Sequence, residues 1–344
     1  MDSKRVVTIY DVAKEANVSV ATVSRVLTHN ARVSAEKKKR VEQAIDKYNY
    51  HPNALARGLS ETKSKTIGII ISDVRNPFYA SLFVECESKA YEMGYMLLLC
   101  NSLGNNQLED MHLEKLVSQR VDAIIQIGGR VDELVACPEY VDHINRIANT
   151  TPVVITGRLE GADCYQVNID EASAMECIME YLIELGHTKI AFLGGRMDVK
   201  GTVDKRSKYR QMLMRYGLPY RSEYVLDSEF YDNADGYLCM QKILQLSERP
   251  TAIIAINDFT ASGIMKSIAE NNMNVPEDFS LASFDNTFLT DVMIPQLTSV
   301  GYDYQKFGDE IMNVAIQAIN SEPVPQITIV NPKLVVRNSC RRIK

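Results

Sequence analysis

The sequence predicts an all-α helix-turn-helix headpiece followed by an α/β core of two doubly wound lobes. Near the N-terminus, two helical patterns at residues 8–16 and 20–27 are separated by three residues, the length of a helix-turn-helix turn. After residue 65 the pattern changes to short apolar runs separated by helix-length segments, which is typical of buried parallel strands. A chain of 344 residues is long enough for two or three domains with apolar cores.

The two leading helices each have a start signal. Thr8 and Asp11 have the spacing of a capping box, with Asp in place of the usual Glu or Gln, and Ser19 is a good N-cap for the second helix. Helical periodicity predicts one shared apolar face, made of Ile9, Val12, Ala13, Ala16, Val18, Val23, Val26 and Leu27. The outer face of the second helix then contains Val20, Ala21, Ser24 and Arg25. That outer face is the surface that a DNA major groove would meet.

A third helix is predicted for residues 34–49, with Val41, Ala44, Ile45 and Tyr48 at the spacing that packs under the first two helices. Residues 52–60 also have a helical composition. An isolated helix of this length is unstable in water, and Gly58 weakens it by about 1 kcal/mol relative to Ala. On composition alone, a flexible linker that ends in residues 61–65 is the alternative.

The net charge of the chain changes sign near the same boundary at which the sequence pattern changes. Residues 1–65 contain 13 Lys and Arg against 7 Asp and Glu, a net charge of +6, and the rest of the chain has a net charge of −12. A basic head attracts the phosphate backbone of DNA, whereas an acidic core discourages the rest of the molecule from lying on it. The run at residues 36–40 is, by itself, ordinary solvated helix surface.

Strands are expected at seven apolar runs, at residues 67–71, 96–99, 123–127, 153–155, 190–193, 252–256 and 281–284. A second round of the same order begins near Thr188, which predicts two similar lobes. Ligands of open α/β sheets bind beyond the carboxyl ends of strands, which are followed here by Asp73, Arg130, Arg158, Asp198, Asn257, Asp258 and Asp285. Such residues could instead cap helices or turns. Together they predict a cleft for a polyhydroxylated ligand, because each hydroxyl both donates and accepts hydrogen bonds.

Several classes of protein are disfavoured. The N-terminus lacks the apolar core of a signal peptide and no run approaches a membrane span, so we expect a cytoplasmic protein. The seven cysteines are scattered, without a CxxC pair or a His at metal spacing, so we expect reduced thiols and no metal or cofactor. No phosphate-binding glycine motif is completed, and His187 is expected to be structural, so an enzyme is not expected. A free-standing solute-binding protein is an alternative class, but it would need an export signal and no headpiece.

One family matches these motifs. The stretch TIYDVAKEANVSVATVSRVL at residues 8–27, followed by Val33-Ser34, YHPNALARGL at residues 50–59 and IGII at residues 67–70, resembles the lactose/galactose repressor family of bacterial transcription regulators. The resemblance extends from Thr8 to about Arg337. Asn17 replaces the usual Gly of the family, but Asn tolerates the left-handed conformation that the turn needs.

The resemblance implies how DNA is bound. Val20, Ala21 and Arg25 would face base edges, and their chemistry suits this role, since Arg pairs with guanine and small apolar groups contact the thymine methyl. The hydroxyl residues are interpreted as caps or phosphate contacts: Thr8, Ser19, Thr22, Ser24 and Ser34. Residues 52–60 would be a hinge helix that orders when two chains pair on the operator and inserts a leucine into the minor groove. The contacts expected in this helix are Asn53, Leu55, Ala56 and Leu59.

The resemblance also implies a periplasmic-binding-protein-like core with an effector between its lobes. The expected effector contacts are Asp73, Phe78, Tyr79, Arg130, Arg158, Arg206, Tyr231, Asn257 and Asp285. Departures from the family pattern at Lys208, at Thr156-Gly157 and at Asn286 leave the effector open. A sugar is expected, and a nucleobase or a phosphoprotein partner is the alternative.

The domain organisation that follows is a headpiece at residues 1–50, a hinge and linker at 51–64 and a core at 65–344. Lobe 1 is expected at residues 65–160 and 297–322, and lobe 2 at 161–296 and 323–344. Three crossings between the lobes would permit closure around a ligand. We expect a homodimer, or a tetramer, whose affinity for operator DNA the effector changes by a population shift in either direction.

Overall fold

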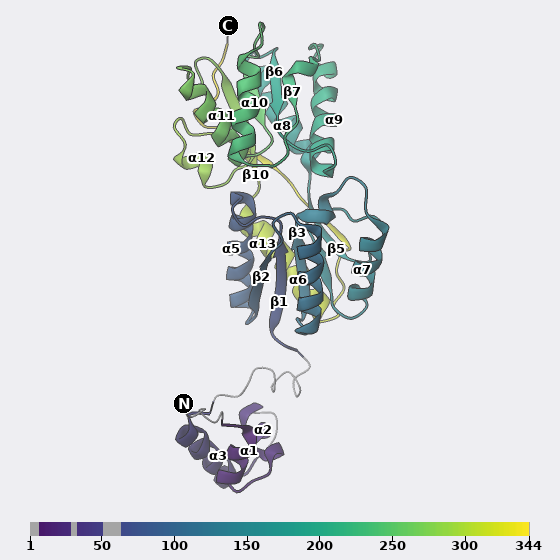
Figure 1. Ribbon diagram of the computed structural model, residues 1–344, viewed down its shortest axis with the longest axis vertical. Helices are drawn as coiled ribbons and strands as arrows, with labels where there is room; N and C mark the ends of the chain where they lie inside the picture. The colour runs from purple at the N-terminus through teal and green to yellow at the C-terminus, as the bar shows by residue number, and fades with distance from the viewer. Residues whose placement is uncertain (1–6, 29–32, 51–62, 344) are drawn as a thin grey trace. The chain divides into compact units, whose positions relative to one another are not determined.

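The computed structural model describes residues 7–28, 33–50 and 63–343 (Figure 1). The chain separates into two compact units, residues 1–64 and residues 65–344. Within the described residues, no helix has the length and apolar character needed to cross a membrane.

The N-terminal unit contains three helices, α1 (Ile9–Glu15), α2 (Val20–Thr28) and α3 (Ala35–Tyr48). Their shared core is made of Val12, Ala13, Ala16, Val23, Val26, Val41, Ala44 and Tyr50. The predicted capping pair is present, because the Asp11 carboxylate accepts hydrogen bonds from the Thr8 N–H at 2.9 Å and from the Thr8 hydroxyl at 2.7 Å. Asn17 has a φ of 50°, which confirms the left-handed turn expected between the two helices.

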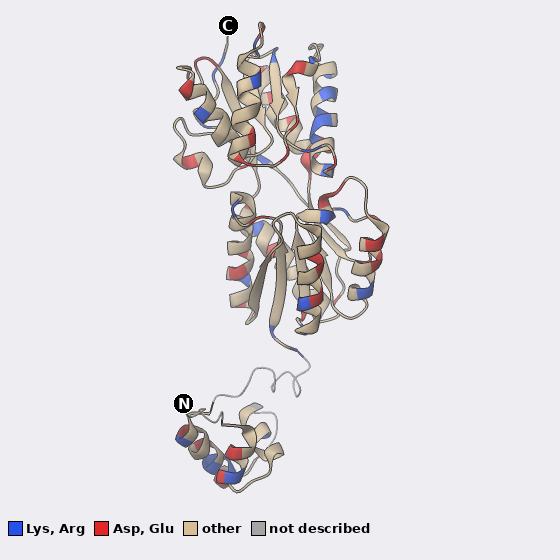
Figure 2. Cartoon of the chain, in the orientation of Figure 1, with Lys and Arg blue, Asp and Glu red and all other residues tan. Residues whose placement is uncertain are grey.

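Side chains of α1 and α3 fasten these two helices together. The Glu15 carboxylate accepts from Lys47 Nζ at 2.6 Å and from the Tyr48 hydroxyl at 2.7 Å. The charged run at residues 36–40 lies on α3, where Lys37, Lys38 and Lys39 are exposed (Figure 2). It is therefore solvated helix surface, as predicted.

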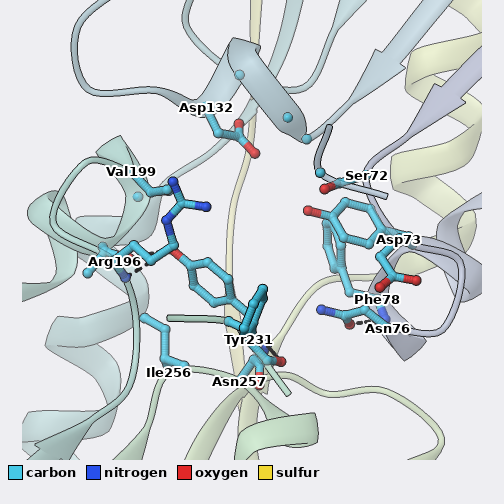
Figure 3. Close-up of a pocket in the computed structure, with 18 of the residues that line it drawn as sticks. Ser72, Asp73, Asn76, Phe78, Asp132, Arg196, Val199, Tyr231, Ile256 and Asn257 are labelled. Carbon is cyan, nitrogen blue, oxygen red and sulfur yellow. Dashed lines mark hydrogen bonds between the residues drawn. The ribbon is translucent and has the colours of Figure 1, made fainter. Parts of the chain in front are cut away.

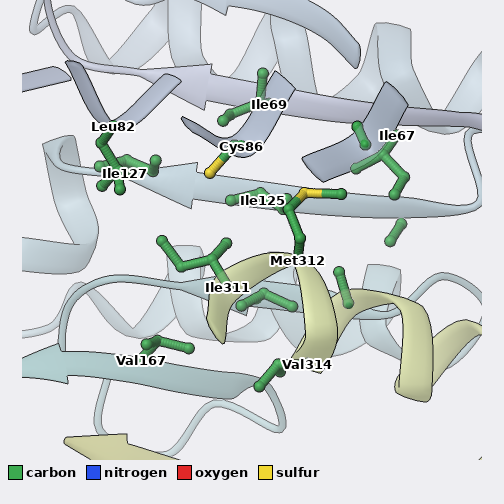
Figure 4. Packing of buried hydrophobic residues seen from close by; sticks show 14 of the residues in the cluster. Ile67, Ile69, Leu82, Cys86, Ile125, Ile127, Val167, Ile311, Met312 and Val314 are labelled. Carbon is green, nitrogen blue, oxygen red and sulfur yellow. The ribbon is translucent and has the colours of Figure 1, made fainter. Parts of the chain in front are cut away.

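The first lobe of the core unit is a six-stranded parallel sheet in the order β11-β5-β4-β3-β1-β2. Its strands are β1 (Thr66–Ile71), β2 (Met96–Asn101), β3 (Ala123–Ile127), β4 (Val153–Ile155), β5 (Tyr165–Ile169) and β11 (Ile327–Val330). The sheet is covered by α5 (Pro77–Glu92), α6 (Asn106–Ser118), η1 (Gly129–Asp132), α7 (Pro138–Ala148) and α13 (Tyr304–Ile319). Ile69 of β1 and Ile125 of β3 pack with Leu82 of α5 and Met312 of α13 (Figure 4). Ile70 and Ile124, which alternate with them, pack on the other face with α6 and α7, so both faces of the sheet are buried.

The second lobe repeats this organisation with the strand order β12-β10-β9-β8-β6-β7, in which only β12 is antiparallel to its neighbour among the described strands. Its strands are β6 (Ile190–Leu193), β7 (Val225–Leu226), β8 (Ala252–Ala255), β9 (Ser280–Asp285), β10 (Thr298–Gly301) and β12 (Lys333–Val335). Its helices are α8 (Glu171–Glu184), α9 (Lys200–Arg215), η2 (Ser222–Tyr224), α10 (Asn233–Leu244), α11 (Asp258–Glu270) and α12 (Leu289–Val292). Two doubly wound lobes were predicted, and the structure confirms them.

The chain crosses between the lobes three times, but not at the residues expected. β5 and β11 pair with each other in the first sheet, and β10 pairs with β9 in the second. The crossings therefore follow β5, β10 and β11, rather than residues 160, 296 and 322. The physical reason is that β11, the edge strand, and its neighbour β5 are short and only partly buried, so neither forms a continuous apolar run.

Candidate functional site

The outer face of α2 contains the residues predicted to face DNA bases. Ala21 and Arg25 are exposed, and Ser24 is partly exposed. Val20 is also partly buried, because it packs against the headpiece core. Arg25 and Ala21 are thus the side chains on this face most available to a base edge.

The headpiece hydroxyls divide into two groups. Ser19 Oγ accepts a hydrogen bond from the Thr22 N–H at 3.3 Å and lies 2.9 Å from the Thr22 hydroxyl, and Thr8 is held by Asp11. These groups have structural partners within the headpiece. Ser34 occupies the N-cap position of α3, is exposed and makes no capping hydrogen bond.

One exposed aromatic residue on the headpiece was not predicted. Tyr10 on α1 is 72% exposed, whereas most apolar residues of this helix pair are buried. A phenol can donate to a phosphate oxygen, so Tyr10 joins the candidates for DNA contact. The remaining predicted DNA contacts, Asn53, Leu55, Ala56 and Leu59, lie outside the described residues.

A cavity of about 520 Å³ lies between the two lobes of the core unit, beyond the carboxyl ends of their strands (Figure 3). From the first lobe it is lined by Ser72, Asp73, Phe78, Tyr79, Asp132, Arg158 and Asn168, and from the second by Glu171, Arg196, Lys205, Tyr231, Asn257 and Asp285, among others. A cavity of this size and mixed lining fits one small polar ligand. Of the nine residues predicted to contact the effector, seven line it: Asp73, Phe78, Tyr79, Arg158, Tyr231, Asn257 and Asp285.

Arg130 is the first of the two predicted contacts that lie elsewhere. Its Nε donates to Glu109 Oε1 at 2.8 Å, it also pairs with Asp110, and its guanidinium lies 3.9 Å from the centre of the Tyr140 ring. The residue follows the end of β3, but η1 turns its side chain toward α6 and α7. Arg130 therefore stabilises the first lobe and is not a cavity residue.

Arg206 is the second predicted contact that lies outside the cavity. Lys205, its neighbour in the sequence, occupies the cavity position that was expected for Arg206. Arg206 pairs with Asp227 and donates to the carbonyl oxygens of Gly194 at 3.4 Å and Leu226 at 3.2 Å. Consecutive residues of a helix point about 100° apart. Lys205, and not Arg206, thus points from α9 into the cavity, where it pairs with Glu171 and lies 4.8 Å from the centre of the Phe284 ring.

Tyr231 and Asn257 are held in place by each other. Asn257 caps α11 by accepting from the Thr260 N–H at 2.7 Å, and its Nδ2 donates to the Tyr231 carbonyl at 3.1 Å. The Tyr231 hydroxyl lies 2.9 Å from the Thr202 hydroxyl. Asn257 is therefore both a helix cap and part of the cavity wall. Phe78 lies across the cavity from this wall, on the first lobe (Figure 3), and its ring centre is 5.3 Å from that of Tyr79.

Two carboxyl groups of the cavity are in surroundings that make their ionisation unfavourable. Burial raises the pKa of Asp132 to about 7, and the nearby Glu171 carboxylate adds to the effect. Burial also raises the pKa of Asp285 well above its usual value, followed by the charge of Asp258, while Lys205 opposes the shift. Asp285 has a φ of 92°, a conformation that an Asp adopts only when the surroundings impose it.

Asp258 imposes part of that geometry from beneath the cavity. This fully buried residue accepts hydrogen bonds from the hydroxyls of Ser283 at 2.5 Å and Ser299 at 2.8 Å. It also accepts from the N–H of Thr287 at 2.6 Å and from its hydroxyl at 2.9 Å. Asp258 was one of the polar residues expected at strand ends, and the structure places it as a support of the turn that carries Asp285.

The lobes also touch through their backbones at the edge of the cavity. The Leu134 N–H donates to the Asp198 carbonyl at 2.7 Å, and Glu133 forms an isolated antiparallel bridge with Val199. The Arg196 Nε donates to Asp198 Oδ1 at 2.9 Å, which orders the second-lobe side of this contact. Within the described residues no group of three or more potential metal ligands is found.

Comparison with known proteins gives consistent matches. Residues 8–53 match the family described as bacterial regulatory proteins, lacI family, and residues 179–340 match the periplasmic binding protein-like domain. The chain is 37% identical over 322 residues to catabolite control protein A of Priestia megaterium, covering 92% of this chain and 94% of that protein. It is 33% identical over 339 residues to the HTH-type transcriptional repressor PurR of Pasteurella multocida, covering 97% of this chain and 98% of that protein.

Solved structures show the same fold. A lac repressor dimer bound to operator and the anti-inducer ONPF superposes with a TM-score of 0.85 at 23% identity, covering 98% of this chain and 100% of that chain. A complex of the transcriptional regulator CelR with cellobiose superposes with a TM-score of 0.70 at 24% identity, covering 97% and 99%. With a helix-turn-helix headpiece, a two-lobed core and full-length relatives above 30% identity, the chain belongs to the lacI family of DNA-binding transcription repressors, which are regulators and not enzymes.

Proposed function

We propose that this repressor binds operator DNA as a homodimer and that a small polyhydroxylated effector, a sugar or sugar derivative, binds in the cavity between the lobes. The observation that carries the proposal is the cavity itself, in which acceptors, donors and aromatic rings from both lobes surround about 520 Å³. Polar groups satisfy the hydroxyls of such a ligand, and rings such as Tyr231 cover its apolar faces. The structural neighbour that holds cellobiose supports this class of ligand.

Effector binding is coupled to DNA through the lobes in this proposal. A ligand that touches both lobes favours the arrangement in which its contacts are complete, and thereby shifts the population of lobe arrangements. The residues proposed to touch it from the first lobe are Asp73, Phe78, Tyr79 and Arg158. From the second lobe they are Lys205, Tyr231, Asn257 and Asp285.

Dimerisation is supported by exposed apolar side chains on both lobes. Val84 and Tyr91 on α5 are 59% and 83% exposed, and Val292 and Ile294 at α12 are 67% and 93% exposed. α5 and α12 lie toward the same side of the core unit in the view of Figure 1. These exposed apolar residues on both lobes are available for an interface between two chains, and a related structure is a dimer on its operator.

On DNA, we propose that Arg25 and Ala21 read bases and that Tyr10 and Ser34 contact phosphates. In the same proposal the segment with Asn53, Leu55, Ala56 and Leu59 contacts the operator centre. The test is a gel-shift titration of Arg25→Ala, which is expected to weaken operator binding by about 1–3 kcal/mol and binding to random DNA much less. Equal losses on both DNAs would show that Arg25 contacts only the backbone.

A purine-type effector is the second candidate, because Phe78 lies across the cavity from Tyr231, Tyr79 also lines the cavity, and a planar base could stack on these rings. The PurR relative supports this alternative. A thermal-shift screen of the intact protein with sugars, nucleobases and nucleosides separates the two. Stabilisation by nucleobases alone would favour the second candidate over the first.

A further inference from the structure

The cavity between the lobes is lined by more carboxyl groups than cationic groups. Eight carboxylates line it, namely Asp73, Asp132, Glu133, Glu171, Asp204, Glu229, Asp232 and Asp285. Five cations line it, namely Arg75, Arg158, Arg196, Lys200 and Lys205. Carboxyl groups that are ionised at this surface repel an anionic ligand and attract a cation.

Most of the cations are already neutralised. Arg75 pairs with Asp73 at 2.6 Å, and Lys200 lies 3.6 Å from Asp204. Lys205 pairs with Glu171, and Arg196 pairs with Asp198. Among the cavity cations that the structure describes, only Arg158, which is exposed, has no carboxylate partner. The cavity therefore offers little free positive charge to a phosphate or carboxylate.

The carboxylates of Asp132 and Asp285 are in the opposite situation. Neither receives a hydrogen bond from any residue that the structure describes, although both line the cavity. Both lie in the electrostatic field of Lys205, whose charge Glu171 already balances. Burial raises the pKa of each despite Lys205, so a cation that enters the cavity beside them would stabilise their ionised forms.

A separate group also lacks a donor. Asn168, on β5, is 4% exposed and lines the cavity. Its Nδ2 donates to Gln166 Oε1 at 3.4 Å, but its Oδ1 has no hydrogen-bond partner. Buried acceptors in folded proteins are nearly always satisfied, so this amide oxygen at the cavity wall is available to a donor from a ligand or from water.

The unpaired acceptors come from both lobes. Asp132 lies at the end of η1 and Asn168 on β5 in the first lobe, while Asp285 ends β9 in the second. Figure 3 shows the Asp132 carboxylate directed toward the space between Arg196 and Ser72. The rings of Tyr79 and Tyr231 also line this space, and aromatic faces attract cations.

From this arrangement we propose that the effector is a polyhydroxylated amine, such as an amino sugar, whose ammonium group pairs with the unpaired carboxyl group of Asp132. An ammonium group donates three hydrogen bonds and supplies the missing positive charge. The hydroxyl groups of the same ligand supply donors for acceptors such as Asn168. The inference rests on the proposed function, because it names the chemical class of the ligand in the same cavity.

The test compares matched sugars on the intact protein by isothermal titration calorimetry. The probes are glucosamine, galactosamine and mannosamine, each beside its neutral parent sugar and the 6-phosphate of that sugar. At least one amine is expected to bind about tenfold or more tightly than its parent, and the phosphates are expected to bind more weakly than the parents. Asp132→Asn is expected to remove most of the preference for the amine, whereas binding of the parent sugar persists.

Glu277→Gln is the matched control, because it removes the same charge at an exposed position outside the cavity. It is expected to keep the amine preference. Parent sugars or phosphates that bind as tightly as every amine would overturn the inference while leaving a sugar effector in place. If no probe of any charge binds, both the inference and the sugar effector are wrong. An amine preference that survives Asp132→Asn would also overturn the assignment.

Discussion

Replacing Asp258 tests the claim that a buried carboxylate sets the shape of the second-lobe cavity wall. Asp258→Ala removes the acceptor for four hydrogen bonds, three from hydroxyls and one from the backbone N–H of Thr287. The hydroxyls of Ser283, Ser299 and Thr287 can rotate toward other acceptors, but the backbone N–H cannot. An orphaned buried donor costs about 1–3 kcal/mol, and the partly recovered hydroxyls add about 0.5–1 kcal/mol each.

These losses are reduced because the substitution also removes a charge whose burial is unfavourable. We therefore expect Asp258→Ala to lower the free energy of unfolding by about 2–5 kcal/mol. We expect Asp258→Asn to cost about half as much, since it keeps one acceptor and its amide can donate to a hydroxyl that rotates. Both variants should weaken effector binding, because the strained turn at Asp285 loses its support.

Urea denaturation of the intact protein followed by circular dichroism measures the unfolding free energies, and calorimetry measures ligand affinity. Two results contradict the reasoning. One is an Ala variant that unfolds at the same urea concentration as the parent. The other is an Asn variant that is less stable than the Ala variant, which would mean that the acceptor count does not determine stability at this site.

Three further predictions follow from single residues. Arg206→Ala should lower the Tm by about 4–12 °C, because two hydrogen bonds to carbonyl oxygens are lost, but it should leave effector affinity within about twofold of the parent. Lys205→Ala, in contrast, should lower effector affinity. The reverse pattern would mean that Arg206 is the cavity residue. Because the φ of Asn17 is 50°, Asn17→Ala should destabilise the headpiece by about 1–2 kcal/mol and Asn17→Gly by less than about 0.5 kcal/mol. Hydrogen exchange of the α1 and α2 amides in the intact chain measures both effects. Equal effects of the two substitutions would exclude backbone strain as the cause. The folded protein holds the Asp132 proton up to about pH 7, so protonated Asp132 contributes fully to stability below about pH 4, and this contribution is lost as the pH rises to about 7. Asp132→Asn should flatten that part of the plot of stability against pH. An unchanged plot would contradict the raised pKa.

The strands that could be predicted from the sequence are those buried on both faces. β1, β3 and β8 are continuous apolar runs because helices cover both sides of their sheets. β7 has two residues and β12 three, and such short edge segments have no periodicity to detect. The headpiece was predictable for a different reason, since its capping residues and left-handed turn are local signals that do not depend on the rest of the fold.

The cavity was predicted in position but only partly in composition. A strand end places a residue near the cleft, but it does not determine where a long side chain points, and so Arg130 turned out to be internal. Helical periodicity gives relative angles around α9, but the absolute rotation depends on packing, which directs Lys205 inward and Arg206 outward. Asp132 and Asn168 belong to no motif, and only the folded chain brings them to the cavity. His187, in contrast, was expected to be structural, and its ring nitrogens lie 2.9 Å from the hydroxyls of Thr251 and Ser280.

The backbone hydrogen bond between Leu134 and Asp198 affects how fast the cleft can open. The three chain crossings hold the lobes together permanently, whereas this hydrogen bond of 2.7 Å and the adjoining bridge between Glu133 and Val199 can break and re-form. Any parting of the lobes that admits or frees a molecule on this side must first rupture it. If an effector binds in this cavity as proposed, the time that it stays bound depends in part on this main-chain contact between the lobes.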